Sequence, residues 1–514
     1  MKSLFLTTVL TAGVATFAVT AAVPAHPGSP AFPAPTADEA AITHVLNRIA
    51  FGPRPGDVEA VKAMGLQAYI DQQLHPERIQ DSGLTARLAG LTTLTMSSRQ
   101  ISDQFEQPLL EARRDRKQDQ AAPAPEGAPA QAAMPDPVQQ RANRVLVELS
   151  EQKMLRAIYS ERQLEEVLTD FWFNHFNVDA RKGPERFMLT EYERETIRPH
   201  VLGKFRDLLE ATAKSPAMLF YLDNWMSADP NGPHPAAQAA RVFRGRFGQP
   251  ILMPPLARVA PQGKNAPKGL NENYGRELME LHTLGVDGGY TQKDVTEVAR
   301  AFTGWTIETP RLGGSFRFEP RLHDEGPKVV LGRTVHAGGQ NDGEQVLDIL
   351  AKHPSTAHFI AMELVRRFVS DTPPPALVDR AARRFSDTDG DLREVMRTIL
   401  TSPELLSPDA YLAKVKTPFE FVVSAMRATA ADMAGDNAAM PLVRAMQQLG
   451  MPLYMCQPPT GYKDTADAWI NTGALVARMN FAVQFVGDKI RGVHPESLGE
   501  STALTYGGPD FQRR

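Results

Sequence analysis

Apolar positions recur at helical spacing along most of the chain. An early example begins near Thr36, and its apolar positions are Ile42, Val45, Leu46 and Ile49. Repeats of three and four residues place such side chains on one face of a helix. The same period returns at residues 354–369, 375–385, 391–400, 418–433 and 472–485. The sequence therefore predicts a mainly α protein with a bundle-like body of many helices.

A different pattern covers residues 314–336. The segment Phe316-Arg317-Phe318 alternates apolar and polar side chains, and residues 328–331 form a short apolar run. Glycine and proline at 326–327 and glycine at 332 bound this run, which is typical of short strands. We predict a small β-hairpin or ribbon around residues 314–336.

Two stretches lose the helical period. Residues 118–138 are rich in alanine, proline, glutamine and glycine, which bury too little apolar surface to offset the entropy of ordering. Both flanks read as helices, so we predict a disordered insertion between paired helices, and a second, proline-rich insertion at 229–268. Residues 36–490 are then a single large helical domain, followed by a C-terminal tail at 491–514.

The first residues predict export. Lys2 precedes an uncharged apolar run from 4 to 22, and small residues lie near position 25, so residues 1–25 read as a signal peptide. Residues 26–35 read as a proline- and alanine-rich tether. An uncleaved anchor is the alternative, but threonines interrupt the run. No later stretch reaches about 18 apolar residues. We expect a periplasmic or secreted protein with no integral membrane segment after cleavage.

Composition narrows the classes of partner and of site. The formal net charge is −4 and no basic stripe is present, so a nucleic-acid partner is not expected. Cys456 is the only cysteine, so an internal disulfide is excluded, and a buried inert thiol is expected. The sequence has no H-E-x-x-H, G-x-S-x-G, P-loop or G-x-G-x-x-G motif, which removes support from common hydrolase and nucleotide-binding classes.

A helical hairpin is predicted at residues 269–305. One helix covers 269–285, a second begins at Thr291–Asp294 and ends at 304–305, and residues 286–290 connect them.

The segment 269–285 is the richest in chemistry. On a helical wheel Asn273, Glu277 and Glu280 fall within a sector of about 60°, at about 100° per residue. Two carboxylates in one sector can share a proton, bind a divalent metal or receive an arginine. Arg276 has the spacing for an ion pair with Glu280, and His282 points away from Glu280 on the wheel. The alternative is bracing of a helical core by buried salt bridges.

Two further groups are candidates. His175 falls near the centre of an apolar helix face, where it is either a metal ligand or general base, or a core histidine bound to one backbone acceptor. His323, Asp324 and Lys328 lie in a loop held by proline and glycine, beside the predicted ribbon. This loop is either a binding element or a polar turn whose Asp324 bonds its own backbone.

Residues 271–278, 281–291 and 301–305 resemble the bacterial domain-of-unknown-function family 1800. The resemblance extends to residues 171–176, 197–200, 217–224, 323–328 and 458–462. It implies a large exported, mostly helical protein and supplies no catalytic residues. Phe173 stands where similar sequences often show a second histidine, which weakens a metal site on that helix.

We therefore expect three polar segments to meet in one cleft: the helix of His175, the hairpin of Glu277 and Glu280, and the loop of His323. The first hypothesis is an exported helical protein that serves as an envelope scaffold or as a partner of another exported protein. The alternative is a metal-dependent or acid/base hydrolase of an extracellular or envelope polymer. There Glu277 or Glu280 with His175 would be the general base or the divalent-metal ligands.

Overall fold

The computed structural model describes residues 37–121, 136–231, 241–244, 250–253, 269–310, 312–435, 437–496 and 501–514. Most of these residues are helical, and the strands form only two-stranded antiparallel sheets. The predicted mainly α fold is thus confirmed. The predicted signal peptide at 1–25 and the tether at 26–35 lie outside the described residues.

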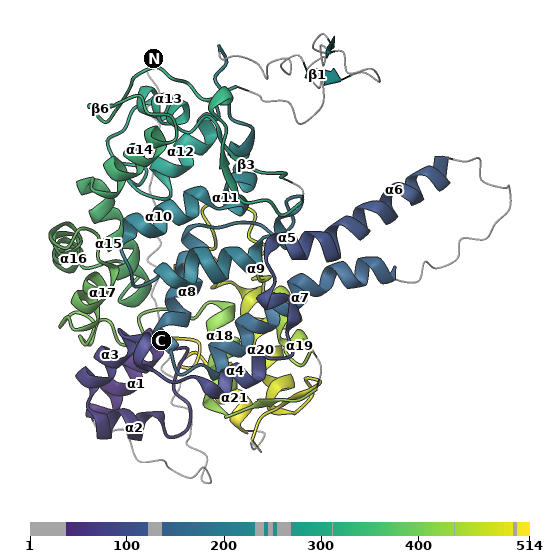
Figure 1. Cartoon of the computed structure of the whole chain (residues 1–514). Coiled ribbons are helices and arrows are strands. Elements are labelled where there is room, and N and C mark those ends of the chain that lie inside the picture. Colours follow the sequence, from purple (N-terminus) through teal and green to yellow (C-terminus); the bar gives the residue numbers. More distant parts are fainter. Residues whose placement is uncertain are drawn as a thin grey trace, which may run out of the picture.

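The helices before residue 230 are α1 (Ala37–Ile49), α2 (Asp57–Met64), α3 (Leu66–Gln73), α4 (Ser82–Leu88), α5 (Ser98–Ile101), α6 (Gln107–Ala121), α7 (Pro137–Tyr159), α8 (Gln163–His175), α9 (Leu189–Glu191), α10 (Phe205–Lys214) and α11 (Pro216–Tyr221). Helix α6 and the first part of α7 extend together away from the body (Figure 1). The Asp136 side chain caps α7 by accepting from the Val138 amide at 3.0 Å. The predicted insertion at 118–138 therefore overlaps both helices, and its residues 122–135 lie outside the description.

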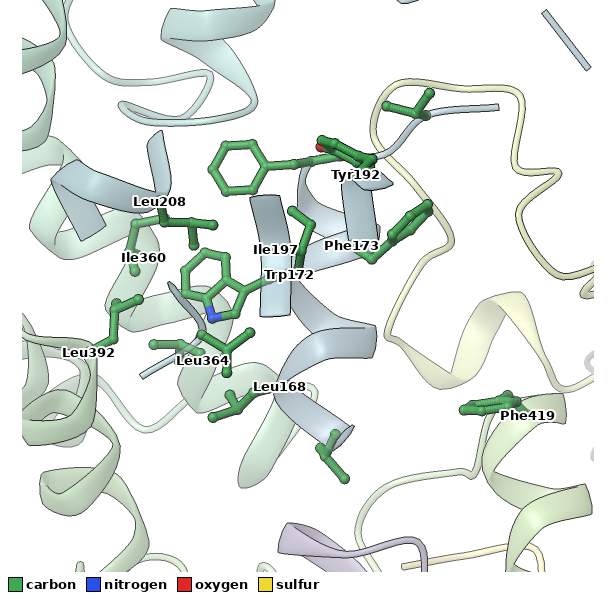
Figure 2. Close-up of a cluster of buried hydrophobic side chains, with 14 of the residues drawn as sticks. Leu168, Trp172, Phe173, Tyr192, Ile197, Leu208, Ile360, Leu364, Leu392 and Phe419 are labelled. Carbon is green, nitrogen blue, oxygen red and sulfur yellow. The ribbon is translucent and has the colours of Figure 1, made fainter. Parts of the chain in front are cut away.

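Helix α8 passes through the centre of the largest core cluster, where the Trp172 side chain is fully buried. Leu208 of α10 lies close to this indole, as do Ile360 and Leu364, which belong to α15 (Pro354–Phe368) (Figure 2). Large aromatic side chains bury more apolar area than any others, so they dominate the energy of such a core. The end of α8, which carries His175, is therefore held firmly.

Helices α12 (Glu272–Glu280) and α13 (Gln292–Ala301) form the predicted hairpin. A Cβ on Gly275 would lie 2.8 Å from the Val295 carbonyl oxygen, so glycine allows this close approach. Thr291 and Asp294 form a capping box at the start of α13. Helix α12 was predicted to run to Gly285 but ends at Glu280, and Leu281–Gly285 form a turn.

Two hairpins follow α13 in sequence. Strand β3 (Trp305–Ile307) pairs with β4 (Phe316–Phe318), and β5 (Lys328–Val330) pairs with β6 (Arg333–Val335). The predicted ribbon at 314–336 is present, although β4 takes its partner from outside that range. Within the proline-rich insertion at 229–268, β1 (Arg241–Arg244) pairs with β2 (Pro250–Met253), and residues 232–240, 245–249 and 254–268 lie outside the description.

The remaining elements are α14 (Asn341–Ala351), α16 (Pro375–Asp387), α17 (Leu392–Leu400), α18 (Pro418–Ala428), β7 (Asp432–Met433), α19 (Met440–Gln448), α20 (Thr472–Val486), β8 (Val493–His494) and α21 (Ser501–Gly507). Residues 491–514 differ from the predicted tail, because β8 pairs with β7 and Arg513 forms a bridge with Val415. The Arg514 side chain is buried against carboxylates, which anchors this segment to the body. Among the described helices, none combines the length and the apolar character that crossing a bilayer demands.

Candidate functional site

Helix α12 does not bring its two carboxylates to a shared partner. The Tyr290 hydroxyl donates to Glu280 Oε2 at 2.6 Å, on the side of the hairpin. Arg276 was predicted to pair with Glu280, but its Nη2 donates to Gln292 Oε1 at 2.5 Å instead. Residues of α13 and of the loop before it thus bind Arg276 and Glu280. A helical wheel drawn for α12 alone does not include these partners. Glu277 faces a different environment.

Asn273 and Glu277 line an open cleft of about 630 Å³. The cleft is built from four segments that are distant in sequence. These are the loop after α8, the end of α11, helix α12 and the loop before α20. Its lining residues are Asp179, Arg181, Lys182, Tyr221, Leu222, Asn273, Glu277, Gln457 and Pro459. Three of the segments on which the family resemblance rests, at 217–224, 271–278 and 458–462, thus contribute to one cleft.

Hydrogen bonds fix the walls of the cleft. Asn177 donates to the carbonyl oxygens of Cys456 and Pro458 at 2.9 and 2.8 Å, which ties the loop before α20 to the end of α8. The Tyr221 hydroxyl donates to the Gln457 carbonyl oxygen at 2.7 Å. Burial raises the pKa of the Cys456 thiol to about 11, so this cysteine is an inert packing group, as the sequence suggested.

Most charges in the cleft are already paired. Arg181 donates from Nε and Nη2 to the two Asp179 oxygens at 3.0 and 2.9 Å. Lys182 pairs with Asp223 at 3.0 Å and also donates to the Tyr221 carbonyl oxygen. Among the described residues, Glu277 has neither an ion pair nor a side-chain hydrogen bond. Burial, and secondarily the charge of Glu280, raises the pKa of Glu277 above its ordinary value.

His175 lies outside this cleft. Its ring packs edge-on against Phe176 at 4.7 Å between centroids, and its Nε2 lies 3.2 Å from the His282 carbonyl oxygen. The His282 ring, buried at 3% exposure, is 6.3 Å from that of His175. Burial lowers the pKa of His175 to about 4 and that of His282 to about 3. Both imidazoles are therefore neutral near pH 7, and no described carboxylate pairs with either.

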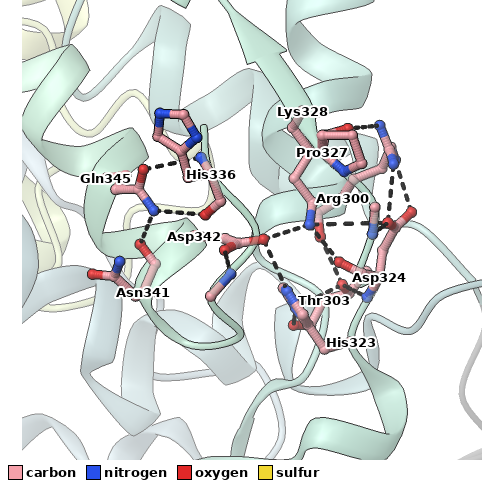
Figure 3. A network of polar contacts seen from close by, with 12 residues as sticks. Arg300, Thr303, His323, Asp324, Pro327, Lys328, His336, Asn341, Asp342 and Gln345 are labelled. Atoms are coloured by element: carbon pink, nitrogen blue, oxygen red, sulfur yellow. Dashed lines mark hydrogen bonds and ion pairs between the residues drawn. The ribbon is translucent and has the colours of Figure 1, made fainter. Parts of the chain in front are cut away.

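The loop of His323 forms a separate buried network (Figure 3). His323 Nε2 lies 3.1 Å from Asp342 Oδ2, and Lys328 Nζ binds the same oxygen at 2.5 Å. His323 Nδ1 lies 2.8 Å from the Thr303 carbonyl oxygen. The His323, Lys328 and Asp342 side chains are at most 1% exposed, so solvent does not reach them. These contacts brace the ribbon against α13 and α14.

Asp324 lies at the edge of this network. Arg300 holds it through two hydrogen bonds, from Nε at 2.7 Å and from Nη2 at 2.9 Å. The Gly326 amide donates to Asp324 Oδ1 at 2.9 Å, which is the turn proposed as the simpler interpretation of this loop. Although burial opposes it, the Arg300 hydrogen bond holds the pKa of Asp324 below its usual range.

The residues predicted from the sequence to share one cleft thus lie in four separate places. Asn273 and Glu277 lie in the cleft, Arg276 and Glu280 bind within the α12–α13 hairpin, and the histidine at 175 lies in an aromatic cluster. His323, Asp324 and Lys328 form the bracing network. In the described part of the chain, no three histidine, cysteine, aspartate or glutamate side chains gather with the geometry of a metal site.

Sequence reasoning missed the charged wall of the cleft. Asp179, Arg181 and Lys182 come shortly after an apolar helix and precede Gly183, and charged residues followed by a glycine in the loop after a helix were an available signal. Gln457 and Asp342 carried no such signal, because each is brought into place by contacts with residues far away in sequence.

The sequence profile of one protein family matches residues 44–512, nearly the whole described body. The chain belongs to this family. Its description is "Protein of unknown function (DUF1800)". No curated protein and no solved structure gave a significant match to the chain. The family membership confirms the resemblance seen in the sequence and assigns no reaction to the cleft.

Proposed function

We propose that this protein is exported and acts as a partner of another exported protein, whose basic segment binds in the cleft of Asn273 and Glu277. The observation that supports this function is the unpaired Glu277 carboxylate. The other charged lining groups, Asp179, Arg181 and Lys182, already have partners of opposite sign. The one charge left over is negative, so the cleft is complementary to a cation.

The surroundings of Glu277 suit a peptide more than an isolated ion. Asn273 and Gln457 are exposed at the rim, and their amide groups can both donate to and accept from a peptide backbone. A lysine or arginine side chain placed against Glu277 would stabilise its ionised form and reverse the effect of burial. The cleft is also open, which an extended segment of a second protein requires.

A photo-crosslinking residue at position 273, introduced in the producing cell, tests this function. We expect a covalent adduct with one exported protein, which mass spectrometry of the adduct identifies together with a basic peptide at the crosslink. In the control protein the photo-crosslinking residue replaces Glu325, which is exposed in the His323 loop. An absence of adducts at 273, or equal adducts at 325, contradicts the proposal.

The purified partner then allows a titration with charge variants. Glu277→Gln removes the charge with little change of shape, and we expect binding to weaken by about tenfold to hundredfold, since a charged hydrogen bond contributes about 1.5–3 kcal/mol. Glu325→Gln removes an equal charge elsewhere and is expected to bind normally. Equal affinities for the two variants would exclude Glu277 as the recognition group.

Export is a separate part of the proposal, supported by the apolar run at 4–22. We expect the protein in the periplasmic or secreted fraction, with its first residue between about positions 22 and 26 in N-terminal sequencing. A cytoplasmic, unprocessed chain would contradict export without affecting the cleft.

The raised pKa of Glu277 favours a second function, acid/base hydrolysis of an envelope or extracellular polymer, with or without a divalent metal. A general acid must carry its proton, so kcat/KM should fall as the pH rises through the raised pKa. Purified peptidoglycan and envelope polysaccharide are suitable probes, assayed with and without added Mg²⁺ or Zn²⁺. Hydrolysis that Glu277→Gln abolishes, in the absence of a protein partner, would favour this function over the first.

A further inference from the structure

The interior between α1, α15 and α18 holds an excess of positive charge. Four cationic side chains and three carboxylates lie together here. The cations are Arg48, Arg367, Lys414 and Arg514, and each of them is at most 4% exposed. We call this group the interior charge cluster. The carboxylates are Asp371, Glu420 and Asp464.

The three carboxylates are occupied by three of the cations. Glu420 Oε1 binds Arg514 Nη2 at 3.0 Å and also binds Arg367. Asp371 binds Lys414 Nζ at 2.5 Å. Asp464 lies 3.6–3.7 Å from the same three cations and completes their compensation. None of these ion pairs includes the fourth cation of the cluster, and Asp464 Oδ2 accepts no hydrogen bond among the described residues.

Arg48 is that fourth cation. It is 0% exposed, and its only hydrogen bond runs from Nη2 to the Ala410 carbonyl oxygen at 2.5 Å. Its Nε and Nη1 have no partner, and Nε of Arg514 has none either, among the described residues. No described carboxylate lies within 4.0 Å of the Arg48 guanidinium. A guanidinium stays protonated in proteins, so neutralisation by proton loss is not available to it.

Neighbouring groups respond to this excess of charge. The pKa of His44 falls to about 4, first because of burial and then because of the positive charge of Arg48. Burial lowers the pKa of Lys416 to about 7, and its Nζ lies 3.9 Å from the Phe511 ring centroid. An uncompensated charge in such an interior is costly by several kcal/mol.

We propose that a small monovalent inorganic anion of the size of chloride binds in the interior beside the unpartnered guanidinium nitrogens of Arg48 and Arg514. The anion would supply the partner of opposite charge that Arg48 lacks among the described residues. A doubly charged sulfate or phosphate is larger and is dehydrated less readily. The site is separate from the cleft and does not depend on the proposed function.

Thermal unfolding of the full chain at constant ionic strength tests the site, with sodium chloride compared with sodium gluconate. We expect Tm to rise by about 3 °C or more in chloride and to keep rising with the logarithm of the chloride concentration, since a ligand that binds only the folded state stabilises it by mass action. Arg48→Met should abolish the chloride dependence. The control Arg99→Met removes an arginine that is 54% exposed and should keep it.

A second measurement remains valid even if Arg48→Met fails to fold. Crystals of the unmodified protein soaked in sodium bromide should show an anomalous peak within about 3.5 Å of the Arg48 guanidinium, the range of a charged hydrogen bond to a large anion. Water alone at that position, or equal Tm values in chloride and gluconate, would overturn the proposal. Equal chloride dependence in Arg48→Met would place the effect elsewhere and would also overturn it.

Discussion

The buried Asp342 carboxylate binds both His323 and Lys328, two residues that the sequence could identify only as candidates. His323 and Lys328 stood out in a loop rich in proline and glycine, but their common partner begins a helix 14 to 19 residues later. Pairing over such distances depends on how the ribbon folds against α14. A local pattern carries no information on that, so the loop's bracing role could not be separated from a binding role.

Asp342→Asn should lower the free energy of unfolding by about 3–5 kcal/mol, because it removes the nearest anion of the buried Lys328 ammonium and leaves only Asp324, 3.9 Å away. Urea unfolding gives this difference. The matched control, Asp348→Asn on the same helix, removes a carboxylate that is 57% exposed and pairs with Arg206. We expect that change to cost less than about 1 kcal/mol. Similar losses for the two variants would contradict the bracing role.

His175 and His282 predict a loss of stability in mild acid. Their pKa values are lowered in the folded state, to about 4 and about 3, so the unfolded chain binds protons first as the pH falls. The contribution of the two histidines to the free energy of unfolding is complete above about pH 6.5, the ordinary pKa of histidine, and is lost progressively below it. Near pH 5, each histidine makes the free energy of unfolding fall by up to about 1.4 kcal/mol for each unit by which the pH is lowered.

Urea unfolding at pH 7, 6 and 5 measures that slope. His282→Gln should make it shallower by nearly one proton, whatever its effect on stability at pH 7. The exposed His336 offers the control, since His336→Gln should leave the slope unchanged. Coincident slopes for the wild-type protein and His282→Gln would show that this imidazole titrates normally in the folded protein.

At the scale of elements, sequence signals predicted the ends of a helix correctly where those ends are stabilised by residues of the same helix. The start of α13 followed from Thr291 and Asp294, which form the capping box seen in the structure. The end of α12 did not follow, because the amide of Leu284 bonds back to the Met279 carbonyl oxygen at 2.7 Å and closes a turn. Extending the wheel past Glu280 therefore misplaced His282.

Helix α20 offers a test of orientation on a single element. Phe481 is 6% exposed and packs against Phe421, whereas Val483, two residues later, is 55% exposed. Phe481→Ala should cost about 3–5 kcal/mol through lost burial and a residual cavity. Val483→Ala should change the free energy of unfolding by less than about 0.5 kcal/mol. Thermal or urea unfolding distinguishes them, and a large loss for Val483→Ala would mean that this face is covered.

At the scale of the whole molecule, the helical period predicted the fold class because many of the helices repeat it locally. The cleft could not be derived in this way. Its charged wall follows α8, the Glu277 carboxylate lies on α12, and Gln457 belongs to the loop before α20. The buried Glu166 shows the same limit, because Arg156 and Arg198, which hold it in the core, lie on other segments of the chain.

Glu420 ties together parts of the chain that are far apart, and its removal is the strongest test of the interior charge cluster as a structural element. Its carboxylate binds Arg367 of α15 and Arg514 beyond α21, and it accepts from the Thr417 amide at 2.8 Å. Although burial opposes it, these arginines hold the pKa of Glu420 below its ordinary value, so its contribution is complete above about pH 4.5.

Glu420→Gln should therefore lower the free energy of unfolding at pH 7 by about 3–5 kcal/mol, because two buried guanidinium groups lose their nearest anion and keep only Asp464, 3.7 Å away. The control Glu404→Gln removes a carboxylate that is 24% exposed from its pair with Arg380, and should cost less than about 1 kcal/mol. Hydrogen exchange should also show faster opening of residues 501–514 in Glu420→Gln alone, since the Arg514 side chain would lose its main anchor. Unchanged exchange there would mean that the strand pairing of Arg513 with Val415 holds this segment without the ion pair.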